Sequence, residues 1–160
     1  MTATLTKSIA GFLAGALAVL VFHQGMYWLL KSSGVTLAGL PWNMAPAKEA
    51  YGLPTLANQM FWGGLWGVAY AFVRRWLPVR PNWLKGFLFG AVFTMLLGSW
   101  VVVSWIKGRP LFNGFLADLQ LMRLYTGFML NGVAFGIGLG IIYGFLSGLL
   151  GHQRIPRRQK

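Results

Sequence analysis

The chain contains no cysteine and only two acidic residues, and both shortages restrict its chemistry. Without cysteine there is no disulfide framework, no thiolate metal site and no cysteine nucleophile. With Glu49 and Asp118 as the only carboxylates, few groups are available for general acid–base catalysis. Phosphate-binding loops, zinc-protease motifs, nucleophile elbows and dinucleotide fingerprints are also absent. We therefore expect a protein that is not an enzyme and that binds no cofactor and no metal.

Charged residues as a group make up 10% of the chain, against about 25% of an average soluble domain. Four apolar stretches between them can each supply the ~20 helical residues that cross a ~30 Å hydrocarbon layer. Pro54 suits the first turn of a helix, so the second span should begin near Thr55. The predicted fold class is an all-α integral membrane protein, a four-transmembrane-helix bundle with one domain over residues 1–151 and spans at about 8–30, 55–74, 85–106 and 126–150.

The net charge of +12 would suggest nucleic-acid binding in a soluble protein, but here Lys and Arg lie at the ends of the apolar stretches. Nine of the 14 basic residues fall in the N-terminal tail, the link between spans two and three, and the tail at 152–160. The other five share the remaining two links with both acidic residues. Because cytoplasmic loops carry the excess of Lys and Arg, both termini are predicted to be cytoplasmic. The basic tail could attract anionic lipid.

The two links on the predicted outer side differ in character. The first, at about 31–54, contains Pro41, Pro46 and Pro54, which restrict its backbone and predict an ordered cap. The second has apolar residues spaced along one helical face at 111–119, which favours a short helix lying in the membrane interface or a leading turn of span four.

Glycine recurs at four-residue spacing, which lets helix backbones approach closely in lipid, where the hydrophobic drive between helices is small. The pattern predicts glycine-zipper packing at Gly11, Gly15, Gly63, Gly67, Gly86, Gly90, Gly132, Gly136, Gly140, Gly144 and Gly148. The long strip on span four admits two interpretations. It packs within the chain, or it forms an interface with another membrane protein or a second copy.

A weak internal repeat relates the two halves. Residues 11–16 and 86–91 are identical in five of six positions, and Met60, Gly63 and Gly67 align without gaps with Met129, Gly132 and Gly136. The match favours two duplicated helical hairpins related by an axis along the membrane normal, as in some transporters. The alternative is coincidence between glycine- and phenylalanine-rich helices.

His23 is the one ionisable side chain well inside a predicted span, which makes it a candidate functional group. Four amides are expected at the same depth: Gln24, Asn58, Gln59 and Asn131. These residues could line an outward-facing polar pocket with His23 as proton acceptor or ligand contact. Alternatively, they only form hydrogen bonds between helices. One histidine and amides offer too few metal ligands, and His152 falls on the opposite side of the membrane, which excludes a bis-histidine haem.

Several stretches resemble an uncharacterised group of small bacterial four-helix inner-membrane proteins. These are Phe22–Met26 (FHQGM), Pro41–Pro46 (PWNMAP), Gly52–Pro54 (GLP) and Phe61–Gly67 (FWGGLWG). The resemblance implies a bacterial origin and an inner-membrane location, and it implies no particular activity.

Two function classes follow from these features. The glycine-lined fourth span and the lack of acidic groups favour a non-catalytic accessory or assembly subunit that packs against other membrane proteins. The polar residues around His23 favour a small transporter or sensor instead. Expected partners are the lipid bilayer and a membrane protein or a second copy of the chain, but not nucleic acid.

Overall fold

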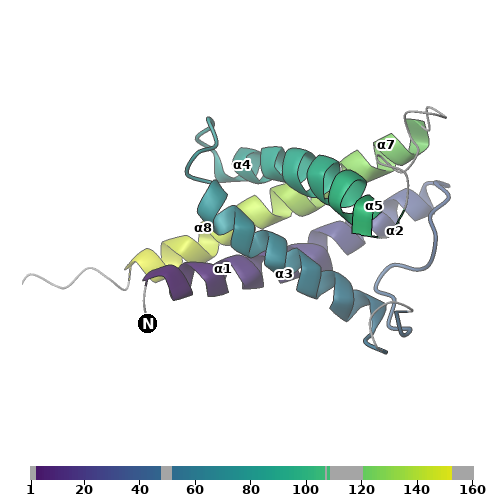
Figure 1. The fold of residues 1–160 in the computed structure, drawn as a ribbon, viewed down its shortest axis with the longest axis horizontal. Coiled ribbons are helices and arrows are strands. Elements are labelled where there is room, and N and C mark those ends of the chain that lie inside the picture. Colours follow the sequence, from purple (N-terminus) through teal and green to yellow (C-terminus); the bar gives the residue numbers. More distant parts are fainter. Residues whose placement is uncertain (1–2, 48–51, 107, 109–120, 153–160) are drawn as a thin grey trace, which may run out of the picture.

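Four helices account for most of residues 3–47, 52–106, 108 and 121–152, which are those described by the computed structural model (Figure 1). The first joins α1 (Ala3–Ala18), the π-helical segment η1 (Val19–His23) and α2 (Gln24–Ser32). The second is α3 (Thr55–Val73). The third joins α4 (Asn82–Phe89), the π-helical η2 (Gly90–Val102) and α5 (Val103–Ile106). The fourth joins α7 (Leu121–Gly127), the π-helical η4 (Phe128–Gly136) and α8 (Ile137–His152). The described residues form no strand, so the all-helical prediction is confirmed.

Two of these helices are long and apolar enough to cross a membrane. They are Ala3–Ser32 and Leu121–Leu150, with 30 residues each. The stretch Asn82–Gly98 is apolar but shorter. Core helices of soluble proteins and signal sequences meet the same criteria, so length and composition alone do not distinguish these cases.

Prolines stand directly before the second and third helices. Pro54 has the non-helical angles φ −54° and ψ 139°, and α3 begins at the next residue, Thr55, as predicted. Pro81, with φ −63° and ψ 134°, precedes α4 in the same way. Proline has no backbone N–H, and the first N–H groups of a helix have no intrahelical partner, so both helices begin without losing a hydrogen bond.

Glycines bring α1 and α3 into backbone contact. A methyl group at Gly11 would lie 2.5 Å from the carbonyl oxygen of Gly67, and one at Gly15 would overlap the backbone of Gly63. A side chain at either position therefore has no room unless the helices separate.

The third and fourth helices cross in the same way. A methyl group at Gly136 would lie 2.5 Å from the carbonyl oxygen of Gly86, and one at Gly90 would lie 2.8 Å from the Cα of Gly136. Further along α8, Gly140 faces the backbone of Asn82, and a methyl group at Gly144 would lie 2.6 Å from the Asn82 side-chain nitrogen. Most of the glycine strip on the fourth helix is thus covered by α4.

The remaining glycines of the fourth helix have looser surroundings or a different partner. A methyl group at Gly132 would lie 3.3 Å from Ala91 Cβ, and one at Gly148 would meet no atom within 4 Å. Gly138 faces the first helix, where Phe22 Cγ would lie 2.5 Å from an added methyl group.

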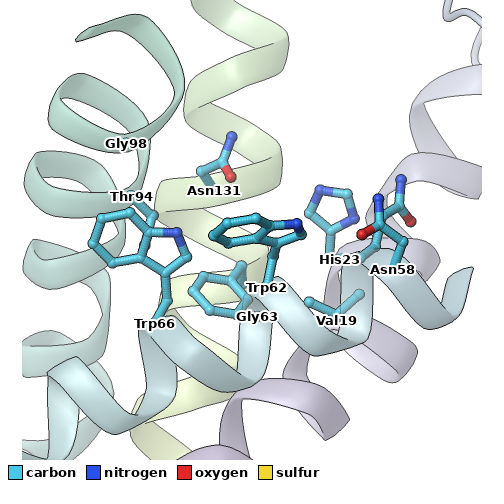
Figure 2. Close-up of a pocket in the computed structure, with 11 residues that line it drawn as sticks. Val19, His23, Asn58, Trp62, Gly63, Trp66, Thr94, Gly98 and Asn131 are labelled. Atoms are coloured by element: carbon cyan, nitrogen blue, oxygen red, sulfur yellow. The ribbon is translucent and has the colours of Figure 1, made fainter. Parts of the chain in front are cut away.

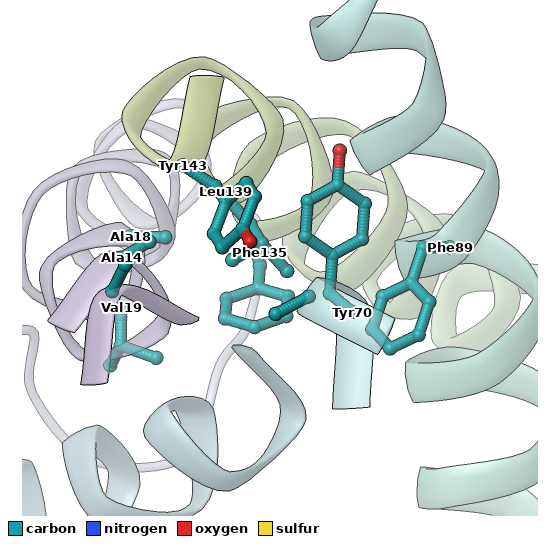
Figure 3. Close-up of a cluster of buried hydrophobic side chains, with 10 residues drawn as sticks. Ala14, Ala18, Val19, Tyr70, Phe89, Phe135, Leu139 and Tyr143 are labelled. Atoms are coloured by element: carbon teal, nitrogen blue, oxygen red, sulfur yellow. The ribbon is translucent and has the colours of Figure 1, made fainter. Parts of the chain in front are cut away.

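Aromatic side chains join α3 to the second half of the chain (Figure 3). Tyr70 and Phe89 are fully buried, with ring centroids 5.3 Å apart, and the Tyr70 ring lies 5.5 Å from that of Tyr143. Phe135 and Leu139 from the fourth helix are buried in the same cluster. Within each hairpin the helices are thus in backbone contact at glycines, whereas α3 contacts the second hairpin through large side chains.

The first link folds back onto the ends of the first and second helices. The backbone N–H groups of Thr55 and Leu56 donate to the carbonyls of Ala45 and Asn43, both at 2.9 Å. The Tyr27 hydroxyl donates to the carbonyl of Ala38. These bonds give the link the character of the ordered cap expected from its prolines. The interfacial helix predicted around residues 111–119 and the tail after residue 152 lie outside the described residues.

Candidate functional site

A cavity of about 230 Å³ lies between the helices at the level of His23 (Figure 2). Four of the five polar residues singled out from the sequence line it: His23, Asn58, Gln59 and Asn131. They come from three different helices. Its other lining residues are apolar, small or hydroxyl-bearing: Val19, Trp62, Gly63, Trp66, Thr94, Gly98 and Phe135. We call this space the His23 cavity.

π-helical segments surround the His23 cavity on three sides. Val19 and His23 belong to η1, Thr94 and Gly98 to η2, and Asn131 and Phe135 to η4. In η1 the backbone N–H of Gln24 donates to the carbonyl of Val19, five residues earlier. Short π-helical insertions, such as the five-residue η1, interrupt the regular α-helical ladder and occur frequently at functional sites. The sequence analysis did not predict them.

Gln24, the fifth predicted residue, lies beside the cavity and is only 2% exposed. Its amide nitrogen donates to Gln59 Oε1 at 2.7 Å and lies 3.4 Å from His23 Nδ1. Its oxygen accepts the backbone N–H of Trp42 at 2.9 Å. Gln24 therefore has a structural role, because it ties the first link and α3 to the first helix.

The polar groups that do face the cavity can form hydrogen bonds but carry no fixed charge. Asn131 Nδ2 donates to the carbonyl of Gly127 at 3.2 Å, which leaves its oxygen and second N–H for other partners. A neutral His23 ring offers one donor and one acceptor nitrogen. No lysine, arginine or carboxylate is among the described lining residues. This lining suits a small uncharged molecule that both donates and accepts hydrogen bonds.

Aromatic rings form the rest of the wall, and the sequence analysis did not select them. Trp66 packs edge-on against Phe89, with ring centroids 6.2 Å apart, and Trp62 is 54% exposed at the rim. The four-residue spacing of Asn58, Trp62 and Trp66 could have identified the two tryptophans as lining residues from the sequence. Residues four apart share a helix face, so both tryptophans lie on the face that carries Asn58.

The cavity is lined by matching positions of the two halves. Continuing the two ungapped sequence matches, eight lining residues form four pairs: Val19 with Thr94, His23 with Gly98, Trp62 with Asn131, and Trp66 with Phe135. The same matches equate the Gly11–Gly67 contact of the first hairpin with the Gly86–Gly136 contact of the second. Both members of each of the four sequence-matched pairs thus line the same cavity.

No metal-binding arrangement accompanies this site. Within the described ranges, no three His, Cys, Asp or Glu side chains come together as a possible ligand set.

No family model, curated protein or solved structure matches this chain. The case for a function therefore rests on the geometry of the His23 cavity and on the surface around it.

Proposed function

We propose that this protein is a four-span integral protein of the bacterial inner membrane, built from two duplicated hairpins, with both termini in the cytoplasm. The outward faces of all four helices support membrane insertion, because each exposes large apolar side chains, among them Leu13, Phe61, Leu97 and Phe145. A soluble monomer rarely exposes a contiguous apolar patch larger than a few hundred Å². The 19 residues of α3 would extend ~28 Å at helical rise, close to the ~30 Å hydrocarbon thickness.

Within that membrane protein, we propose that the His23 cavity binds a small uncharged ligand as part of a transporter or sensor. The observation that carries this proposal is the convergence of His23, Asn58, Gln59 and Asn131 on one cavity. At this depth in a bilayer a polar group has no bulk water to bond, so it must pair within the protein or with a ligand. Both ends of the Gln24 amide are bonded to its neighbours, whereas Gln59 and Asn131 each use only one end of the amide in a bond to the described part of the protein.

The accessory-subunit hypothesis has less geometric support. Besides the lack of acidic groups, it was based on a glycine strip on the fourth helix that was free to contact a partner, and α4 of the same chain covers Gly136, Gly140 and Gly144. Assembly with another membrane protein or a second copy stays a prediction, but the glycine strip no longer supports it.

A labelling experiment tests access to the cavity. Because the chain has no cysteine, Asn131→Cys introduces a single thiol at the cavity wall. We expect a small neutral thiol reagent to modify it in membranes, with exposed Ser33→Cys as the positive control. If Ser33→Cys reacts and Asn131→Cys does not, small molecules do not enter the cavity.

A binding screen tests the role of His23. Purified protein is heated with a panel of uncharged hydrogen-bonding compounds, such as amides, ureas, polyols and quinones, and a ligand raises the unfolding temperature by mass action. His23→Gln should remove the shift. His152→Gln should keep it, because this other histidine lies 21 residues beyond Asn131, ~30 Å along the fourth helix. A shift that survives His23→Gln, or no shift with any compound, would contradict the proposal.

A further inference from the structure

A second cavity, of about 170 Å³, is lined by residues near the start of α1, near the end of α8 and directly after α3. In Figure 1 these three helix ends lie together at the end of the bundle that carries the N-terminus. Its polar lining consists of two cations and three hydroxyl groups: Lys7, Arg74, Thr6, Tyr143 and Ser147. We call it the cationic cavity. None of these residues lines the His23 cavity.

No carboxylate in the described part of the chain balances these two charges. The only acidic residues, Glu49 and Asp118, fall outside it. Two like charges that face one space repel each other, and an anion bound between them would remove that repulsion.

Arg74 is held in a position suited to such an anion. One terminal nitrogen donates to Asn82 Oδ1 at 2.9 Å, and the guanidinium carbon lies 5.0 Å from the centroid of the Tyr143 ring. Its Nε–H is buried without a hydrogen-bond partner among the described residues. These contacts, together with a hydrogen bond to the Tyr70 side chain, orient the group and leave some of its five N–H donors for a ligand. A planar guanidinium with free donors matches the oxygens of a phosphate group.

We propose that the cationic cavity binds a phosphate group, with Arg74 as the oriented donor and Lys7 as the second cation. Both are at the end of the bundle that the proposed topology places in the cytoplasm. There the phosphate belongs either to the headgroup of an anionic phospholipid or to free phosphate. Basic pockets between transmembrane helices on this side are suited to anionic headgroups.

Native mass analysis and thermal unfolding of the purified full-length protein test the site. One arm adds phosphatidylglycerol or cardiolipin in mixed micelles, with phosphatidylcholine as the reference, and the other adds inorganic phosphate alone. At about fivefold per removed charge, Lys7→Gln should weaken binding about fivefold and Lys7→Gln/Arg74→Gln about 25-fold. Arg75→Gln is the matched control, because Arg75 stacks on Trp76 and does not line the cavity.

The two arms distinguish the sources of the phosphate. Binding of anionic lipid alone, lost in the double variant and kept in Arg75→Gln, supports a headgroup site. An unfolding temperature raised by inorganic phosphate, with the same variant pattern, supports a free phosphate site. The proposal is overturned if neither probe binds, or if Arg75→Gln weakens binding as much as Lys7→Gln. Because Lys7 is exposed at the start of α1, its variant keeps the test valid if Arg74→Gln fails to fold.

Discussion

The two hairpins share a backbone arrangement but differ in the chemistry they present. Glycines meet at the crossing of α1 with α3 and again at the crossing of α4 with the fourth helix. Around the His23 cavity, however, the first hairpin supplies His23, Asn58 and Gln59, whereas the position matched to His23 in the second hairpin is Gly98. Close packing thus requires the same residues in both halves, while the binding chemistry is concentrated in the first.

The largest expected loss of stability comes from replacing a glycine at the helix crossings that both hairpins share. Gly15→Leu should destabilise the protein by more than about 3 kcal/mol, because the side chain would overlap the backbone of Gly63 and neither helix backbone can yield. Gly86→Leu, at the second crossing, should do the same. Thermal unfolding and the yield of monodisperse protein measure both effects.

Gly25→Ala is the matched control, since a methyl group there meets no atom within 4 Å. It should leave stability unchanged or raise it by up to about 1 kcal/mol, the difference in helix propensity. A crossing that tolerates leucine in one hairpin alone would show that the two halves do not pack equivalently.

A smaller loss of stability is expected at Gly98, where the second hairpin differs from His23 of the first. In Gly98→Ala the new methyl group would lie 2.7 Å from Trp66 Cζ2, so the indole must move, at a cost of about 1–3 kcal/mol. Displaced toward the cavity, the ring should also slow labelling of Asn131→Cys. Trp66→Phe in the same chain should restore both stability and labelling. Unchanged labelling in Gly98→Ala would show that this glycine does not set the size of the cavity.

The hydrogen-bonded amides of the first hairpin, Gln24 and Gln59, give the next prediction. Gln24→Leu should cost about 1–3 kcal/mol, because it leaves the Trp42 N–H and Gln59 Oε1 without their partner. Ser8→Ala removes an exposed side-chain bond to the Thr4 carbonyl and should change stability by less than about 0.5 kcal/mol. Unfolding curves of the two variants decide whether Gln24 is structural. An equal effect of both changes would argue against it.

Apart from the control variants, the smallest stability effect is expected for His23→Gln. Glutamine keeps a donor and an acceptor, and we expect a change of about 1 kcal/mol or less despite loss of ligand binding. A large loss of stability would instead show that His23 mainly holds the helices together.

The start of α3 and the positions of the helices could be predicted from the sequence, whereas the π-helical segments could not. Pro54 gave the start of α3, and apolar stretches gave the helices, because both act through neighbouring residues. The depth of His23 and Asn131 followed from helical rise, and the structure places both at one cavity. The π-helical segments leave no such local signal, because they depend on how neighbouring helices pack. Trp62 and Trp66, in contrast, could have been found from the sequence, because they follow Asn58 at four-residue spacing on the same helix face.

Trp42 in the first link adopts φ 48°, a left-handed conformation that costs a bulky residue about 1–3 kcal/mol. Two hydrogen bonds from Trp42 to the first helix offset this cost. Its backbone N–H donates to Gln24, and its indole N–H donates to the carbonyl of Leu20 at 2.9 Å. Leu20 belongs to η1, the segment that also carries His23, so the indole bond attaches the first link directly to the wall of the His23 cavity. Pulling the first link away from the first helix would therefore break hydrogen bonds at Leu20 and Gln24, the residues that flank His23 in the chain.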